Sequence, residues 1–478
     1  MSFLVYDLIF LGFFLTVSII FLYKKKKNIK KDGLFYLYRA NWGINLINRI
    51  GKKYQKTMKV LSYACITCGY MLMIGMFYLV YTLVKLYIFM PDAVKAIKVP
   101  PITPLVPYLP QIFNLEFLPP FYFTYWILIL AVIAITHEMA HGILAAYNDV
   151  RIKKTGFGFF PFFLPIFLAA FVELDEKIMQ KKKNFSQRAI LSAGTFANVL
   201  TAILFGAILL IFSAMAFVPS GVIFDNYAMS FITIGGISSV NGIALNNPTY
   251  DSVLDNLEED LNVLVFDEKE YLITRKMFEE QNEEGEEEIL AYVSAPAIKA
   301  NLSSIITEIN DVPIYGWDSL TKELLKYSPG DKITITTLFQ GGVKTTEIEL
   351  GEHPNPELGG RAWLGITVPQ AYSGNNILMK LMNPLSLTES GVYHESKLGD
   401  LGFFIYHLFW WVFLISISVA LINMLPMGVF DGGRFFYLTV LSITKNEKLS
   451  KKMFSFSTKF FLLIALLLII LWGVSFFR

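Results

Sequence analysis

Charge and cysteine are scarce in this chain. Only 17% of its 478 residues are charged, the formal net charge is +2, and there are two cysteines and five histidines. Two cysteines cannot build a disulfide framework. Because Cys65 and Cys68 lie in an apolar segment, packing is favoured over a redox or metal pair. The nearly balanced charge gives no reason to expect nucleic acid as a partner.

Long apolar runs are abundant instead. Hydrophobic residues make up 54% of the chain and the mean hydropathy is +0.50, which is typical of a multi-pass membrane protein. Six segments are long enough to be transmembrane helices: about 3–23, 60–90, 121–147, 188–218, 401–425 and 453–477. The first is followed at once by lysines and has no cleavage site, so we expect a retained anchor rather than a signal peptide.

The basic residues alternate between the loops that connect these spans. Twelve Lys and Arg lie in 24–59, eight in 151–188 and four in 445–452, but only two in 91–120. Because basic loops face the cytosol, both termini and the large region 219–400 are predicted to be extracytosolic.

The third predicted span ends in a motif that packing does not explain. His137 and His141 are four residues apart, so they share one face of a helix. The HExxH spacing is typical of a helix that binds zinc, with Glu138 between the two ligands as the general base. Titratable groups in hydrocarbon are costly, so three of them within five residues indicate a polar cavity. We expect this site near the cytosolic end of the span.

A third protein ligand is needed, because two histidines leave a catalytic zinc one ligand short. Asp431 is the best candidate, since it lies in NMLPMGVFDGGR (423–434), where Pro and Gly break a helix at membrane depth. Broken backbone is tolerated there if it lines a cavity. His407 stands about four turns earlier in the same span, which is too far away on a straight helix.

The stretch 156–174 is apolar but rich in Phe, Pro and Gly. We expect strands or a re-entrant hairpin shielded by protein, because open strand edges cannot face lipid. Such an edge could pair with an extended substrate. A distorted helix or a cytosolic amphipathic turn is the alternative.

A polar residue also stands among small ones at the start of the fourth span, in SAGTFANVL (192–200). Small residues let helices approach closely, and Asn198 needs a partner within the membrane. Two interpretations remain open: helix packing, or a place beside the site where Asn198 stabilises the substrate or a ligand.

The region 219–400 has a different character. Alternating patterns predict strands at 305–310, 332–339 and 344–350, and a helix at 318–327. An acidic insertion is expected at about 250–292, and no internal repeat is evident. These elements predict a small α+β module outside the membrane.

In the order of its motifs the chain resembles the site-2 proteases, zinc metalloproteases that cleave within membranes. HEMAH, GFGFF…FVELDE, SAGTFANVL and NMLPMGVFDGGR follow one another as the family's HExxH, β region, GxxxN and NxxPxxxxDG segments do. The chain departs from the pattern at 194–195, where Gly-Thr replaces Gly-Pro, and at 423–426, where NMLP replaces NPxP.

The resemblance implies one Zn²⁺ per chain and hydrolysis of peptide bonds in or near the transmembrane segments of membrane-tethered proteins. It implies as ligands His137, His141 and Asp431. Glu138 would be catalytic, and Asn198 and Asn423 are candidates for binding the substrate or the oxyanion.

The implied fold is a polytopic α-helical membrane protein of about six transmembrane helices, with a membrane-associated β region. The expected domains are the N-terminal helices and basic loop (1–120), the first half of the catalytic core (121–218), the extracytosolic module (219–400), the second half of the core (401–444) and a last helix (445–478).

The extracytosolic module is similar to a PDZ domain in residues 294–314. Leu364, Gly365 and Ile366 of AWLGI are similar to a PDZ carboxylate-binding loop, which implies a C-terminal peptide as a further partner beside the substrate and the lipid bilayer.

Two other functions compete with a protease. A non-catalytic scaffold would hold a structural zinc and bind C-termini, although a structural zinc normally has four protein ligands. A transporter or channel would use the intramembrane charges as an ion pathway. Binding of a metal ion that keeps one coordination position free of protein ligands would distinguish the protease from the scaffold and from the transporter.

Overall fold

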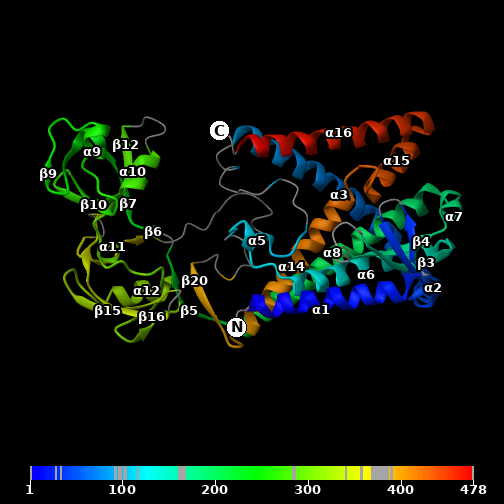
Figure 1. Cartoon of the computed structure of the whole chain (residues 1–478), viewed down its shortest axis with the longest axis horizontal. Coiled ribbons are helices and arrows are strands. Elements are labelled where there is room, and N and C mark those ends of the chain that lie inside the picture. Colours follow the sequence, from blue (N-terminus) through cyan, green and yellow to red (C-terminus); the bar gives the residue numbers. More distant parts are fainter. Residues whose placement is uncertain are drawn as a thin grey trace. The chain divides into compact units, whose positions relative to one another are not determined.

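The computed structural model describes residues 3–26, 29–32, 35–90, 94, 100, 105–115, 118–159, 168–224, 226–281, 287–339, 342–355, 359–367, 387 and 391–475. Contacts divide the chain into two compact units, one of residues 1–209 and 404–478 and one of residues 210–403. We call the first the membrane unit and the second the β unit (Figure 1).

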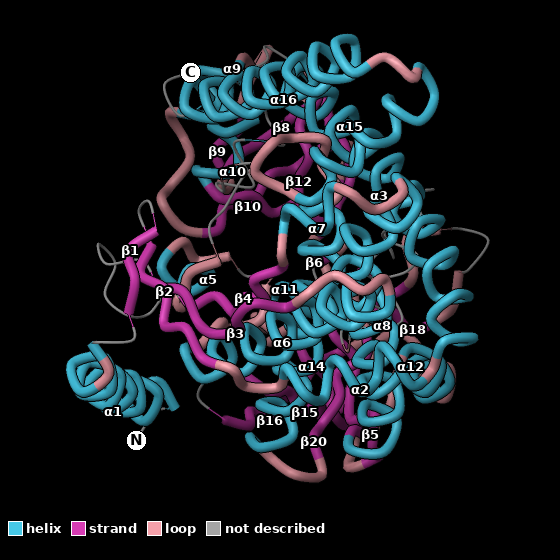
Figure 2. The backbone as a smooth tube through the Cα atoms, turned by 90° about the vertical axis from the view of Figure 1, so that its right-hand side faces the viewer, coloured by secondary structure: helices cyan, strands magenta, loops and turns pink. Residues whose placement is uncertain are grey.

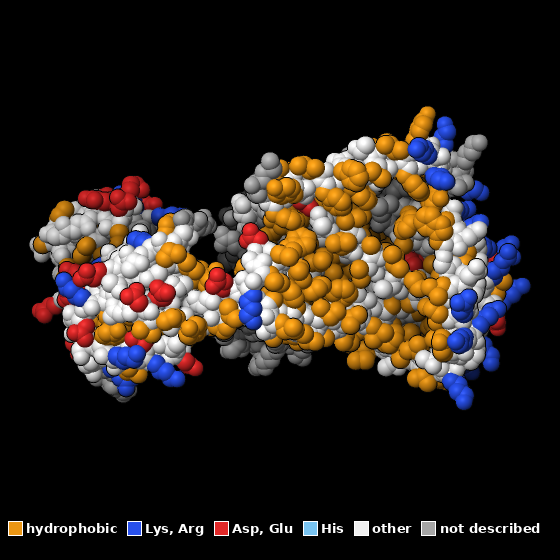
Figure 3. Space-filling view, turned by 90° about the horizontal axis from the view of Figure 1, so that it is seen from below, with side chains coloured by type: hydrophobic (Ala, Val, Ile, Leu, Met, Phe, Trp, Pro, Cys, Tyr) orange, Lys and Arg blue, Asp and Glu red, His pale blue; other side chains and the backbone are white. Residues whose placement is uncertain are grey.

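The six predicted spans are confirmed as helices long and apolar enough to cross a bilayer. They are α1 (Phe3–Lys24), α3 (Gln55–Phe89), α6 (Phe123–Tyr147), α8 (Asn184–Ala216), α14 (Asp400–Asn423) and α16 (Glu447–Ser475). A helix satisfies the hydrogen bonds of its own backbone groups, as a segment within the hydrocarbon core of a bilayer must. Figure 3 shows hydrophobic side chains across the face of the membrane unit, with Lys and Arg gathered at one end. The protein is therefore a multi-pass membrane protein.

Helix α1 is joined to α6 by a buried carboxylate. Asp7 is 2% exposed and accepts hydrogen bonds from the backbone N–H groups of Phe123 and Thr124, at 2.8 and 2.9 Å. These N–H groups begin α6 and have no partner within the helix. The Tyr108 hydroxyl donates to the same carboxylate at 2.6 Å. Asp7 thus caps the helix that carries HEMAH, where its charge also meets the positive end of the helix dipole.

The expected β region forms a sheet within the membrane unit. Strands β3 (Ile152–Phe159) and β4 (Leu168–Leu174) pair antiparallel, which confirms strands rather than a distorted helix, and residues 160–167 lie outside the described part. The hairpin of β1 (Ile29–Asp32) and β2 (Phe35–Ala40), which the sequence did not predict, extends the sheet in the order β1-β2-β3-β4 (Figure 2). Among the described strands, β4 is therefore an edge strand.

The core of the membrane unit joins α3, α6 and α8 to a shorter helix, α15 (Asp431–Thr444). Its members include Cys65, Leu144, Ala193 and Phe435, none more than 3% exposed. Both cysteines are free thiols and Cys65 lies in this core, while the packing interpretation of the pair stays a prediction. The described part of the unit also contains three further short helices: α2 (Ile44–Lys53), α5 (Leu109–Ile112) and α7 (Glu176–Gln180).

The described part of the β unit contains two six-stranded sheets, each with its own apolar core. The first has the order β7-β12-β11-β10-β8-β9. Its strands are β7 (Met229–Thr233), β8 (Ile237–Val240), β9 (Ile243–Ala244), β10 (Leu261–Phe266), β11 (Lys269–Thr274) and β12 (Glu288–Val293), with helices α9 (Tyr250–Leu254) and α10 (Arg275–Gln281). The segment 250–292, expected to be an insertion, supplies three of these strands, and its residues 282–286 lie outside the described part.

The second sheet has the order β16-β15-β13-β5-β20, with β14 beside β13. Its strands are β5 (Phe217–Ile223), β13 (Ile305–Ile309), β14 (Val312–Pro313), β15 (Lys332–Phe339), β16 (Gly342–Glu349) and β20 (Val392–Ser396), with helices α11 (Pro296–Lys299) and α12 (Trp317–Leu324). The predicted strands and helix at 305–350 are confirmed. Two short ladders pair β17 (Gly351–Glu352) with β18 (Ala362–Trp363), and β19 (Ile366–Thr367) with β6 (Asn226–Tyr227).

The two sheets share a repeated unit that was not evident from the sequence. The order β8-β9-α9-β10-β11 in the first matches β13-β14-α12-β15-β16 in the second. Asn241 donates its N–H to the carbonyl of Val263 at 2.8 Å and accepts from the N–H of that residue at 2.9 Å. Asn310 makes the same pair of bonds with Thr334, at 2.9 and 2.8 Å. The β unit therefore consists of two related modules rather than one.

Candidate metal centre

The two histidines of HEMAH converge with Asp431 on one point. They lie one turn apart on α6, with their Nε2 atoms 3.0 Å from each other. Oδ2 of Asp431 lies 3.6 Å from Nε2 of His137 and 3.2 Å from Nε2 of His141. Both histidines are nearly buried, at 8% and 9% exposure. In the part of the chain that the structure describes, these three residues are the group that could hold a metal ion.

The spacing of the three atoms fits zinc. Two ligands about 2.0–2.1 Å from a tetrahedral zinc are about 3.3 Å from each other, and the separations here are 3.0, 3.2 and 3.6 Å. Gly194 faces the same space, because an added Cβ would lie 2.4 Å from Nε2 of His141 and 2.5 Å from Nε2 of His137. Three protein ligands with a fourth position free are typical of catalytic zinc.

Asp431 reaches the histidines because the chain breaks between α14 and α15. Helix α14 ends at Asn423 and α15 begins at Asp431. A Cβ on Gly432 or Gly433 would lie 2.3 or 2.1 Å from a backbone atom of the 424–427 turn. Only glycine lets the new helix start against that turn, which explains the Asp-Gly-Gly sequence.

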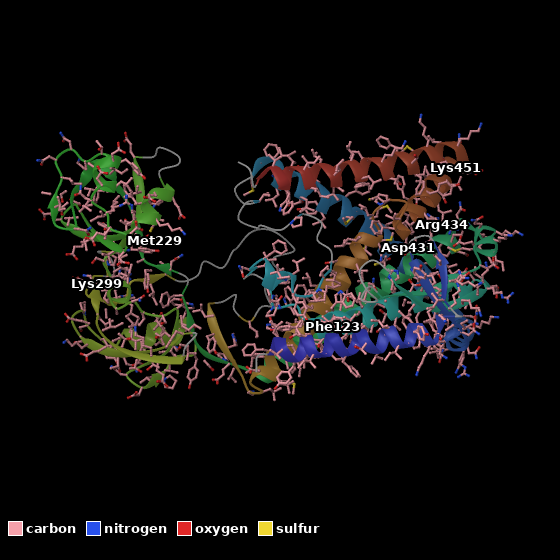
Figure 4. All side chains as sticks on the ribbon, in the orientation of Figure 1. Phe123, Met229, Lys299, Asp431, Arg434 and Lys451 are labelled. Carbon is pink, nitrogen blue, oxygen red and sulfur yellow. The ribbon has the colours of Figure 1, made fainter. Side chains whose placement is uncertain are left out.

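Polar contacts hold this break from two sides. The Ser457 hydroxyl of α16 donates to the Pro426 carbonyl at 2.7 Å. On the other side Arg434 forms an ion pair with Glu176 of α7 at 2.7 Å. Figure 4 shows Asp431 and Arg434 toward the same end of the membrane unit as Lys451, with Phe123 farther from that end.

Helix α8 contacts both imidazole rings at Nδ1, whereas Nε2 of each ring faces Asp431. Nδ1 of His141 lies 2.7 Å from the Ile190 carbonyl oxygen. Nδ1 of His137 lies 3.0 Å from the amide nitrogen of Asn198, a residue with no exposed surface. Within the described residues the amide oxygen of Asn198 has no hydrogen-bond partner. The structure therefore places Asn198 against a candidate ligand.

Glu138 lies on the edge of the sheet. Its Oε2 accepts a hydrogen bond from the Val172 N–H of β4 at 2.8 Å. Because β3 pairs with the opposite edge of β4, this N–H is directed away from the ladder. The proposed base and the open edge of β4 are thus side by side.

The remaining candidates are dispersed. Asn423 is the half-buried last residue of α14, and the structure records no hydrogen bond of its side chain to the described residues. His407 is not among the converging groups, as its distance along α14 predicted. In the β unit, Leu364, Gly365 and Ile366 line a groove of about 290 Å³ against α12.

Sequence reasoning missed the contributions of Ile190 and Val172, and it predicted close helix approach at 192–200 without placing Gly194 against the histidines. A backbone carbonyl or N–H leaves no signal in residue type. A four-residue spacing does link Ile190, Gly194 and Asn198, which indicates a common helix face. Which helix that face would meet could not be read from the spacing.

Comparison with known proteins agrees with this geometry. A family model described as peptidase family M50 matches residues 125–468, which is most of the chain and includes every residue of the candidate metal centre. The chain is also 26% identical over 169 residues to the zinc metalloprotease RasP of Shouchella clausii, covering 30% of this chain and 40% of that protein. The chain thus aligns with less than half the length of this curated relative. With its family motifs in register on a six-helix membrane unit, the chain belongs to peptidase family M50.

Proposed function

We propose that this protein is a zinc endopeptidase that hydrolyses peptide bonds in or near the transmembrane segments of membrane-tethered proteins. The observation that carries the proposal is the convergence of His137, His141 and Asp431 between helices suited to a bilayer. Membership of peptidase family M50 and the likeness to a zinc metalloprotease support it.

Each residue of the centre has its own task in this mechanism. The two histidines and Asp431 would hold the zinc, which when bound would supply a Lewis acid for water and for the scissile carbonyl. Glu138 takes the proton of the attacking water and later donates it to the leaving amine. Because Asn198 already contacts a candidate ligand, Asn423 is the better candidate donor to the oxyanion.

We also propose that substrates pair with the edge of β4. A transmembrane substrate must unwind before cleavage, because its helix satisfies every carbonyl internally. An extended segment added to β4 would run beside Glu138, which contacts Val172 of that strand. Substrates with Gly, Pro or Asn near the cut should therefore be preferred.

Cleavage of a single-span substrate by purified protein in detergent tests the function. Glu138→Gln should retain zinc and lose about 10²–10⁴-fold in rate, and a zinc chelator should abolish cleavage. Glu447→Gln, which alters an exposed carboxylate at the start of α16, is the matched control. Cleavage that survives Glu138→Gln would contradict the mechanism. Zinc retention without cleavage of any test substrate would favour the scaffold alternative.

The pairing with β4 is tested by Ala170→Pro. The Ala170 N–H points to the same open edge as that of Val172, two residues later, so proline removes a donor to the substrate without breaking the ladder to β3. Cleavage should fall while zinc content stays unchanged. Normal cleavage by this variant would exclude strand pairing. Unchanged cleavage of substrates whose helix is stabilised by Leu at the cleavage site would exclude it as well.

We further propose that the metal centre lies near the cytosolic side and the β unit outside. The end of the membrane unit where Lys and Arg gather (Figure 3) is the end that the positive-inside rule assigns to the cytosol. Protease protection of tags placed in the 151–188 loop and in the β unit tests this orientation. Protease added outside sealed vesicles should digest one of the two tags and leave the other intact, because the tags lie on opposite sides of the membrane.

A C-terminal peptide is the proposed ligand of the groove at Leu364, Gly365 and Ile366. This groove is open beside α12, whereas in the first module Tyr250 of the corresponding helix α9 stacks on Phe278 at 4.8 Å. The groove would bind a newly exposed C-terminus, or the β unit would exclude bulky ectodomains. Deleting 294–368 should then admit uncleaved substrates, and unaltered selectivity would remove this role.

A further inference from the structure

We propose that one face of α8, formed by Ile190, Gly194 and Asn198, makes both candidate ligand histidines bind zinc through Nε2. Asn198 acts in it as a positioning residue, by accepting a hydrogen bond from Nδ1–H of His137. The inference rests on the proposed zinc site and adds a role for α8 that the ligand motif alone does not contain.

The face arises from the way α8 lies along α6. Residues four apart share a helix face, so Ile190, Gly194 and Asn198 follow one another along α8, as His137 and His141 do along α6. His141 contacts the first of the three and His137 the last. The two helices therefore run antiparallel at the site, and each imidazole has its own partner on α8.

The partner of His141 fixes its tautomer. A carbonyl oxygen accepts hydrogen bonds and cannot donate, so the contact of 2.7 Å with Ile190 requires the proton on Nδ1. A neutral imidazole then carries its lone pair on Nε2, which is the atom that faces Asp431 at 3.2 Å. Hydrogen bonds of this kind orient most metal-binding histidines.

His137 requires the same tautomer, since its Nε2 also faces Asp431. Its Nδ1–H then needs an acceptor, and the Asn198 amide lies 3.0 Å away. An amide can present either end, and its orientation follows from the hydrogen-bond network. With Oδ1 turned to the ring, the amide oxygen that otherwise lacks a partner among the described residues receives the Nδ1–H.

Gly194 completes the face between these two contacts. An added Cβ would fall 2.4 and 2.5 Å from the two Nε2 atoms, a distance that real Cβ contacts do not reach. Glycine therefore lets α8 approach closely enough for its neighbours to reach the rings, and it leaves free the space where the ligands converge. A methyl group at 194 would compete with the metal.

Zinc affinity measured by competition with a chelator tests the role of Asn198, using purified full-length protein. Asn198→Leu keeps the size of the side chain and removes the acceptor, so the zinc dissociation constant should rise about 10–100-fold. Asn198→Asp keeps an acceptor and should restore affinity to near that of the wild type. Thr201→Val is the control, because Thr201 lies one turn farther along α8 and contacts Thr136 of α6 rather than a histidine.

Gly194→Ala gives an independent reading if Asn198→Leu does not fold. It should lose zinc while still unfolding in a cooperative thermal transition, whereas Gly75→Ala, where the nearest atom lies 3.5 Å from the added Cβ, should bind zinc normally. Wild-type zinc affinity in Gly194→Ala would overturn the proposed face.

Asn198→Leu that binds zinc normally but loses cleavage would overturn the positioning role and assign Asn198 to the substrate. Wild-type protein that binds zinc but cleaves nothing would contradict the proposed activity alone.

Discussion

Two sets of glycines, one in the membrane unit and one in the β unit, are required for contrasting reasons. In the membrane unit, an added Cβ would come within 2.6 Å of a neighbouring atom at Gly51, Gly194, Gly432 and Gly433. In the β unit, the backbone is left-handed and no atom lies within 4 Å of an added Cβ at Gly242, Gly330, Gly342 and Gly360.

This difference follows from how each unit is held together. Helices in a bilayer gain little from the hydrophobic effect, so they depend on close backbone contact through small residues. Sheets outside the bilayer bury apolar side chains and need glycine chiefly where a turn demands positive φ. Substitutions should therefore propagate to the metal centre in the membrane unit and stay local in the β unit.

The largest effect is expected from Gly433→Ala. Its Cβ would lie 2.1 Å from the Met427 carbonyl oxygen, so the start of α15 must move and carry Asp431 away from the histidines. Zinc affinity should fall at least tenfold, with about 1–3 kcal/mol lost in stability from overpacking. Gly242→Ala should cost about 1–2 kcal/mol for its left-handed backbone and leave zinc affinity unchanged. Equal zinc binding by both variants would contradict the contrast between the units.

The second comparison concerns helix caps. Asp7→Ala removes a buried charged acceptor of four hydrogen bonds at 2.5–2.9 Å, and hydrogen bonds to charged groups contribute about 1.5–3 kcal/mol each. Thr249→Ala removes a local, exposed capping box from α9 and should cost about 1 kcal/mol. Denaturation of both variants should show the larger loss for Asp7→Ala. A smaller loss there would mean that α1 contributes little to the position of α6.

The third prediction is that the β unit folds alone. Strands β5 and β20 pair with each other at the two ends of the segment 217–396, and both cores lie between them. The excised segment should be water-soluble and unfold cooperatively. Failure to fold would show that it depends on the membrane unit for its stability.

The smallest effects are expected within the repeat. Asn241→Ala and Asn310→Ala each remove equivalent hydrogen bonds, so each should destabilise its module by a similar ~1–2 kcal/mol. Asn247→Ala is the control, because Asn247 also has positive φ but its side chain has no recorded hydrogen bond among the described residues. Strongly unequal losses would argue against equivalent roles in the two modules.

The sequence predicted the local elements well where one periodicity dominates. The six spans, the strands around 305–350 and the helix at 318–327 all appear. The repeat was hidden because ISSVNGIAL and ITEINDVPI share a pattern but few identical residues. The hairpin β1-β2 was hidden because its lysines resemble an ordinary cytosolic loop.

For the metal centre, the sequence by itself determined the ligand types and their spacing. HExxH places two imidazoles and a carboxylate on one helix turn, and Asp-Gly-Gly after a broken span supplies a third candidate ligand; both follow from helix geometry and ligand chemistry. Only the tertiary structure decided which atoms surround them. The Ile190 carbonyl, the Val172 N–H and the space left by Gly194 are contacts between elements distant in the chain. Backbone groups are the same in every residue, so their role is set by which helix or strand packs against which.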